Sequence, residues 1–84
     1  MLIDTHCHLD AAEFDADRDA VHAAALAAGV GWIVVPAVAV DGFAKTKNVV
    51  ERYPGCLAAY GIHPLYVMAA RDGDLAVLRD WLAG

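Results

Sequence analysis

The sequence has little cysteine, few basic residues and no long apolar run, and each shortage excludes a class of protein. Its two cysteines, Cys7 and Cys56, are too few for a disulfide framework, which predicts a reducing, cytoplasmic environment. Six Lys and Arg against eleven Asp and Glu give a net charge of −5, which argues against a nucleic-acid module that binds through a basic patch. Charges or turn residues interrupt every apolar stretch before the roughly 18–20 residues of a membrane span, so no membrane partner is expected.

Apolar residues, in contrast, are abundant for so short a chain. The hydrophobic set makes up 60% of the 84 residues, while a domain of this size buries only about 60% of the surface that its unfolded chain exposes. The chain therefore has more apolar surface than one compact body of its size can hide. We expect residues 1–84 to form a single, incomplete domain that is part of something larger or that self-associates through open sheet edges.

The apolar runs and turn signals predict three strands, each followed by a helix. The continuous β-branched run after Trp32 favours a strand covered on both faces, and Pro36 should end its regular part because proline has no amide hydrogen to donate. Strands that alternate with helices form a parallel sheet, so the predicted fold is α/β with a parallel βαβαβα order. The expected strands are residues 2–8, 32–40 and 56–63, and the expected helices start at 15–19, 41 and 72–74.

Local signals also predict the helix ends and the buried helix faces. Gly29 fits the position that follows a helix end, Asp41 is the expected N-cap of the second helix, and Asp72 and Asp74 are expected to cap the third. Helical spacing predicts which apolar side chains are buried. They are Phe43, Val49, Val50 and Tyr53 in the second helix, and Leu75, Leu78 and Leu82 in the third, with Trp81 beside that face.

The strongest functional feature is a histidine pair in the first predicted strand. Side chains alternate along a strand, so His6 and His8 are expected to point to one side and Cys7 to the other, where it is a core thiol. Two neutral imidazoles on one face can bind one divalent ion. The pair also follows an apolar strand at the rim where parallel α/β sheets carry their sites. The alternative is two polar residues that merely begin a loop, and we favour the metal.

Gly61-Ile62-His63-Pro64 repeats this arrangement at the end of the third predicted strand. His63 is therefore expected at the same rim as the histidine pair, although alone it equally fits a histidine that hydrogen-bonds a neighbouring loop. Asp4 and Asp10 are candidates to orient a ligating imidazole, or they are ordinary strand-edge and turn carboxylates. His22 lies in the first predicted helix and is interpreted as structural or surface. The basic residues of the later helices are interpreted as a solvated face: Lys45, Lys47, Arg52, Arg71 and Arg79.

Residues 3–10, Ile-Asp-Thr-His-Cys-His-Leu-Asp, followed by Gly-Ile-His-Pro at 61–64, resemble the start of the TatD family of metal-dependent hydrolases. The resemblance spans all 84 residues but only the first third of a family member. It implies a TIM-type (β/α)8 barrel, of which this chain supplies the first three βα units. It also implies one or two divalent metal ions in the complete barrel (Zn, Mg or Mn) and, as in many members, deoxyribonuclease activity.

The resemblance also assigns roles to individual residues. His6 and His8 would be metal ligands, and His63 would lie on the substrate or phosphate side. The remaining family ligands, a glutamate, two histidines and an aspartate from later strands, have no counterpart before Gly84, and Leu65 stands where members often carry a second histidine. We therefore expect no catalytic residue within the chain and little or no turnover from it alone. The implied substrate is DNA or a small phosphoester.

Three alternatives remain open at this point. The same histidine pair begins amidohydrolases that cleave C–N bonds and PHP-type phosphoesterases. Leu9-Asp10 after the pair argues against the PHP type, which has a Ser-Asp-Gly turn there, and the segment 61–64 is more typical of TatD than of C–N hydrolases. The third alternative is a non-catalytic metal-binding module that covers its sheet edges by forming oligomers.

Overall fold

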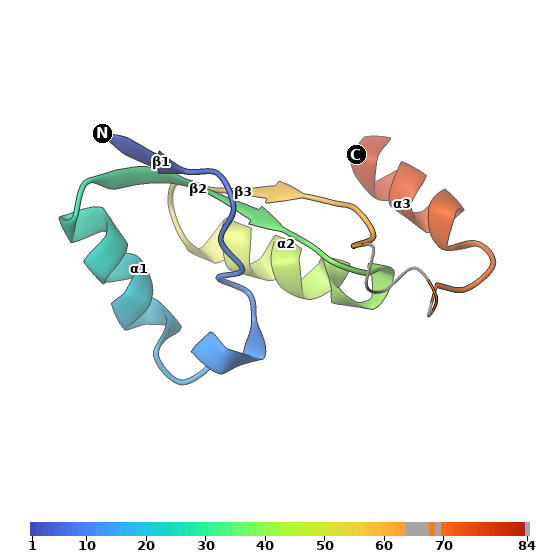
Figure 1. Cartoon of the computed structure of the whole chain (residues 1–84), viewed down its shortest axis with the longest axis horizontal. Helices are drawn as coiled ribbons and strands as arrows, with labels where there is room; N and C mark the ends of the chain where they lie inside the picture. The colour runs from blue at the N-terminus through green and yellow to red at the C-terminus, as the bar shows by residue number, and fades with distance from the viewer. Residues whose placement is uncertain (64–67, 69, 84) are drawn as a thin grey trace.

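The computed structural model describes residues 1–63, 68 and 70–83, in which strands and helices alternate along the chain (Figure 1). Pro64 and Leu65, both singled out above, lie outside the described residues. Short 3-10 turns precede two of the helices, η1 at Ala12–Phe14 and η2 at Val40–Gly42. The strands are β1 (Leu2–Asp4), β2 (Val30–Pro36) and β3 (Cys56–Ala59), and the helices are α1 (Arg18–Ala27), α2 (Phe43–Arg52) and α3 (Asp74–Ala83).

The three strands form one parallel sheet in the order β1-β2-β3, with Asp4 opposite Ile33 and Ile33 opposite Cys56. This confirms the predicted parallel βαβαβα order. β2 ends at Pro36, as expected. β1 and β3 are shorter than predicted, because the ladder with β2 ends at Asp4 and at Ala59. Beyond the ends of β1 and β3, further backbone hydrogen bonds continue this pairing. The Cys7 N–H donates to Val34 O of β2, and the His63 N–H donates to Val38 O in the segment after β2.

The core lies between the sheet and helices α1 and α2, which pack on the same side of it (Figure 1). Ile33 and Val35 point into this core and are 5% and 0% exposed. Trp32 on β2 and Leu57 on β3 belong to the opposite face and are 43% and 52% exposed. The prediction of a strand covered on both faces is therefore wrong for the described residues, because both packed helices cover the same face.

The helix ends agree with the prediction at the first helix and differ at the second. Gly29 follows α1 and adopts a φ of 95°, a conformation that favours glycine. Asp41 is not the N-cap of α2, because it lies inside the 3-10 turn η2 and Gly42 takes the cap position without a side-chain hydrogen bond. At the start of α3, the Asp74 carboxylate accepts a hydrogen bond of 2.9 Å from the backbone N–H of Arg71.

The buried face is predicted well for α2 and poorly for α3. Phe43, Val49 and Tyr53 are buried as expected, with Val50 partly buried. Leu75 and Leu82 of α3 are 76% and 63% exposed. Trp81 makes the helix contact instead, with its ring 5.7 Å from Phe43 and 5.1 Å from Tyr60.

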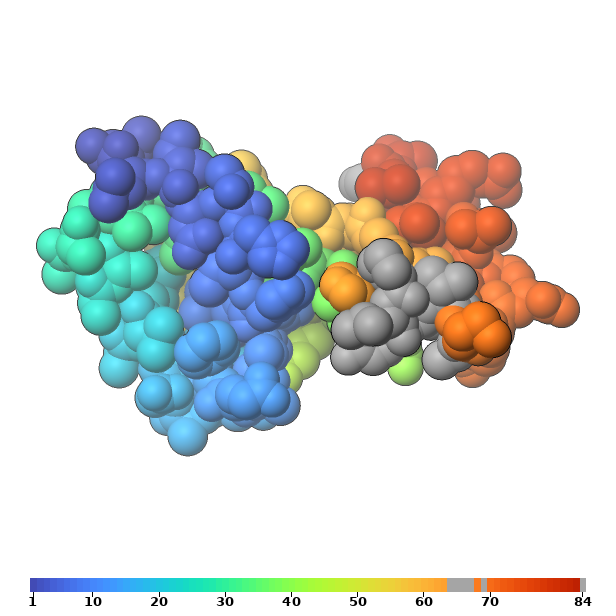
Figure 2. All heavy atoms as spheres, viewed as in Figure 1, coloured from blue at the N-terminus to red at the C-terminus, as the bar shows by residue number. Residues whose placement is uncertain are grey.

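The molecule is elongated, measuring 43 × 26 × 20 Å. Figure 2 shows the N-terminal segment and α1 at one end and α3 at the other. None of the helices within the described residues is long and apolar enough to cross a membrane.

Candidate metal centre

His6 and His8 lie side by side just beyond the end of β1. Their Nε2 atoms are 3.1 Å apart, and the ring centroids are separated by 4.8 Å with the ring planes almost perpendicular. His6 is exposed and His8 half-buried. The two rings meet although β1 ends at Asp4, so the predicted convergence is correct but strand alternation is not its cause.

The spacing of these nitrogens fits a shared metal ion. Two nitrogens that each lie about 2.05 Å from one ion are about 3.3 Å apart at a tetrahedral angle and about 2.9 Å apart at a right angle. The observed 3.1 Å between His6 Nε2 and His8 Nε2 falls between these values. Among the described residues, no third His, Cys, Asp or Glu joins them in a group able to hold a metal. The pair therefore offers two of the four or more ligands that a bound ion requires.

The two candidate orienting carboxylates contact other groups. Asp4 Oδ1 accepts a hydrogen bond of 3.1 Å from the backbone N–H of His6, which turns the chain out of β1. Asp10 Oδ2 accepts a 2.5 Å hydrogen bond from the hydroxyl of Thr46, a fully buried residue of α2. Asp10 thus fixes the segment after His8 against α2. A direct bond from either carboxylate to an imidazole stays a prediction.

His63 lies at the same rim as His8, as predicted. Both line a cavity of about 470 Å³ that opens beside the carboxyl end of β2. Asp10, Glu13, Lys45 and Thr46 contribute to its wall. The structure therefore brings His63 and His8 to the wall of one cavity.

A comparison with models of known protein families shows to which family this chain belongs. The model of the TatD-related DNase family matches residues 3–83. The chain belongs to this family.

Known TatD proteins extend well beyond the matched segment. The uncharacterized metal-dependent hydrolase YjjV of Escherichia coli is 45% identical over 81 residues, which are 96% of this chain and 31% of that protein. Human deoxyribonuclease TATDN3 is 38% identical over 94% of this chain and 29% of its own length. The crystal structure of E. coli YjjV superimposes with a TM-score of 0.89 at 39% identity, over 98% of this chain and 32% of that one. The chain thus spans about a third of these relatives, and the predicted first three βα units of a TatD-type barrel are confirmed.

The remaining cysteines and histidine of this TatD chain are structural. Cys7 and Cys56 are free, and burial, followed by the nearby Asp4 and Asp10 carboxylates, raises the pKa of the Cys7 thiol. A raised pKa keeps the thiol protonated and unsuited to act as a nucleophile. His22 is buried, with Nε2 3.1 Å from the carbonyl oxygen of Pro54, in agreement with the structural interpretation.

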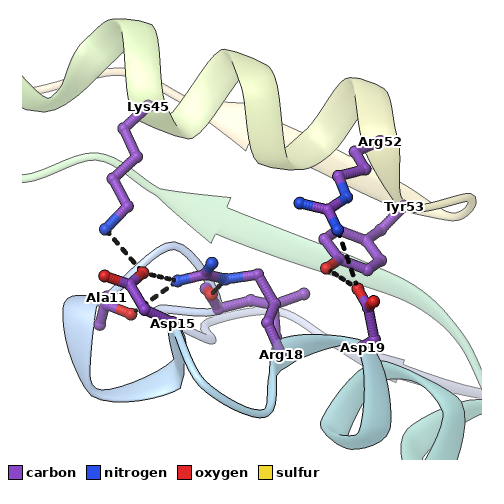
Figure 3. A network of polar contacts seen from close by, with 8 residues as sticks. Ala11, Asp15, Arg18, Asp19, Lys45, Arg52 and Tyr53 are labelled. Carbon is purple, nitrogen blue, oxygen red and sulfur yellow. Dashed lines mark hydrogen bonds and ion pairs between the residues drawn. The ribbon is translucent and has the colours of Figure 1, made fainter.

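A buried arginine, which the sequence did not single out, shapes the segment after the histidine pair (Figure 3). Arg18 is 9% exposed; its Nε donates to Leu9 O at 2.7 Å and its Nη2 to Ala11 O at 2.9 Å. Nη2 also donates to Asp15 Oδ1 at 2.7 Å, and Lys45 Nζ reaches the same oxygen at 3.2 Å. Hydrogen bonds from Arg18 and then from Lys45 lower the pKa of the Asp15 carboxyl.

Lys45, interpreted from the sequence as part of a solvated face, is indeed exposed, and it also lines the cavity beside His8 and His63. Thr46 was also missed, although its burial places it at the centre of the contact between Asp10 and α2. The only local signal was the helical spacing of Thr46, which lies three residues from both Phe43 and Val49 on the buried face.

Proposed function

We propose that this chain supplies the first part of a TatD-type, metal-dependent hydrolase that cleaves phosphodiester bonds, with DNA as the substrate. The observation that carries the proposal is the 3.1 Å approach of His6 Nε2 to His8 Nε2. The family supports a metal-dependent reaction, because the E. coli relative is named a metal-dependent hydrolase and the human one a deoxyribonuclease. Residues 1–84 are proposed to form one part of a single barrel domain.

In this proposal His6 and His8 hold a divalent ion, which is Zn, Mg or Mn, at one or two sites in the whole barrel. Such an ion supplies a water of lowered pKa and positive charge toward a phosphate oxygen. Asp4 and Asp10 hold the backbone on either side of the pair, through the His6 amide and through Thr46. Within this chain we assign no general acid or base.

His63 lies on the substrate side of the proposed site. Its backbone N–H is fixed by a 2.7 Å hydrogen bond to Val38 O, which ties the segment after β3 to the segment after β2. His63 lines the same cavity as His8, so a phosphate ester held there would lie next to the proposed ion. The imidazole can donate a hydrogen bond to such a phosphate oxygen.

Metal titration tests the proposal directly. We expect the chain to bind Zn²⁺ weakly in isothermal titration calorimetry, because two imidazoles are an incomplete ligand set. His6→Ala and His8→Ala should each abolish this binding, since one remaining imidazole holds no ion firmly.

The matched control for this titration is His63→Asn. It also removes an imidazole at the rim, and Zn²⁺ affinity should remain unchanged because the proposal assigns the ion to His6 and His8 and not to His63. His22→Ala is a poor control, because His22 is buried and bonded to Pro54. Zn²⁺ binding that survives in both His6→Ala and His8→Ala would contradict the proposal.

A second property is supported by the face of the sheet that the described residues leave exposed. Ile3, Trp32 and Leu57 are 58%, 43% and 52% exposed, a large apolar surface for a small protein. We propose that copies of this chain self-associate through the open edges of the sheet, together with this exposed face. The free Cys7 and Cys56 support a reducing location, and we propose the cytoplasm.

A further inference from the structure

His8 is the first residue of a tight turn whose two central residues are anchored in different ways. The backbone N–H of Ala11 donates to His8 O at 2.9 Å, which closes the turn. Leu9, the first central residue, is 1% exposed and belongs to the core. Asp10, the second central residue, is half-buried and lines the same cavity as His8. The position of the His8 imidazole therefore depends on what holds the Asp10 side of this turn.

Thr46 of α2 contacts the Asp10 carboxylate directly. Its hydroxyl oxygen lies 2.5 Å from Asp10 Oδ2 and 3.2 Å from Gly42 O. Both neighbours are acceptors, while a hydroxyl has a single hydrogen to donate. The Gly42 carbonyl lies four residues earlier and is the acceptor that a threonine within a helix ordinarily uses. The much shorter distance assigns the hydrogen to Asp10, and it is typical of a hydroxyl bonded to a carboxylate, at about 2.5–2.7 Å.

The surroundings of Thr46 make its hydroxyl a fixed point. The residue is 0% exposed, and its branched Cβ restricts the side chain to few rotamers. The neighbouring Lys45 differs in both respects, because its long side chain is 45% exposed and reaches the exposed Asp15. A bond from a buried hydroxyl to a charged acceptor is also stronger than one between neutral groups. Thr46 can therefore hold Asp10 against α2 in one place.

We infer that Thr46 is a positioning residue for the proposed metal centre: its hydroxyl holds the Asp10 carboxylate and, through it, the turn that places the His8 ring beside His6. The inference rests on the proposed function for the identity of the ion. It goes beyond that function because it makes metal affinity depend on one buried hydroxyl of α2, outside the ligand set.

The experiment compares Thr46→Val with Thr46→Ser, by Zn²⁺ titration calorimetry and by thermal unfolding of the whole chain. Valine keeps the shape of the side chain and removes the hydroxyl; serine keeps the hydroxyl and removes a buried methyl group. Thr46→Val should weaken Zn²⁺ binding about tenfold, as expected when a group that orients a ligand is lost. Thr46→Ser should bind Zn²⁺ within about twofold of the unchanged chain, although its melting temperature should fall by roughly 4–8 °C. Zn²⁺ affinity that follows the melting temperature in both variants would refute the positioning role.

A double-mutant cycle tests whether the hydroxyl acts through Asp10. Thr46→Val and Asp10→Ala each remove the same hydrogen bond, so the double variant should bind Zn²⁺ within about twofold of the weaker single variant. Losses that multiply in the double variant would mean that the two groups act separately, and the inference would fail.

NMR of the metal-free chain separates this inference from the proposed function. The His6 and His8 ring centroids are 4.8 Å apart, so a nuclear Overhauser effect between the two rings reports their approach. It should persist in Thr46→Ser and weaken in Thr46→Val. If the unchanged chain binds no Zn²⁺ but this pattern is seen, the metal proposal fails and the positioning role stands. If Zn²⁺ binds equally well to the unchanged chain and to Thr46→Val, the positioning role fails and the metal site stands. If Zn²⁺ does not bind and the effect is equal in all three proteins, both fail.

Discussion

Replacing Arg18 with methionine should destabilise the chain more than any other single change to a charged residue that the structure describes. Methionine keeps an unbranched apolar stem but removes the guanidinium group, leaving the carbonyls of Leu9 and Ala11 without the donors at 2.7 and 2.9 Å. Each hydrogen bond to a charged group contributes about 1.5–3 kcal/mol. The pair with Asp15 adds little, because the Asp15 side chain is 59% exposed.

These values predict that the free energy of unfolding falls by about 3 kcal/mol, after the cost of burying the guanidinium group is subtracted. For a chain of this size that is a fall in melting temperature of roughly 12–24 °C. Arg18→Lys should recover only the ion pair with Asp15, because an ammonium group lacks the planar fork that reaches several acceptors at once.

Thermal unfolding followed by circular dichroism measures this loss. The matched control is Arg52→Met, because Arg52 is 65% exposed and pairs at 3.3 Å with Asp19, the residue that follows Arg18 in α1. Its removal should cost less than about 1 kcal/mol. Equal melting temperatures for the Arg18 and Arg52 variants would refute the reasoning that burial makes the Arg18 contacts strong.

Two other predictions follow from named contacts. Arg18 and Lys45 lower the pKa of Asp15 in the folded chain; stability from this carboxylate is therefore complete above its unfolded pKa of about 3.9 and is lost as the pH falls through the lower folded value. Acid unfolding curves should show a shallower loss in Asp15→Asn, and identical curves would contradict the assignment. If the exposed sheet face drives self-association, light scattering should show a mass that rises with concentration, and Leu57→Glu should reduce it; a monomer at every concentration would remove that proposal.

The order of the elements was predictable because each strand and helix is encoded by consecutive residues. The apolar run from Trp32 to Pro36 and the turn at Gly29 are local signals, and both lie where expected. The face of α3 was not predictable in the same way. Helical spacing groups Leu75 with Leu82, but it does not say what packs against them, and in the structure Trp81 takes the contact with Phe43.

In the candidate site as well, a contact between residues close in sequence was predictable and contacts between distant residues were not. His6 and His8 are two residues apart, and their rings lie on the same side as predicted, although the backbone between them is not the expected strand. Thr46 and Asp10 are 36 residues apart, and Lys45 and Asp15 are 30 apart. No sequence pattern of one chain brings such pairs together, because each depends on how α2 packs beside the segment after β1.

That packing links the proposed metal ligands to α1 and α2. The segment from His8 to Asp15 is held by Arg18 from α1 and by Thr46 and Lys45 from α2, so its position depends on both helices. Loss of the Thr46 contact with Asp10 should therefore disturb the imidazole pair, whereas loss of the Lys45 ammonium group, which contacts the exposed Asp15, should not. Comparing Zn²⁺ affinity between Thr46→Val and Lys45→Gln distinguishes these cases, because Thr46→Val leaves Asp10 without its buried donor. We expect Zn²⁺ binding to weaken in Thr46→Val and to stay unchanged in Lys45→Gln; equal effects would mean that the Asp10 contact does not position His8.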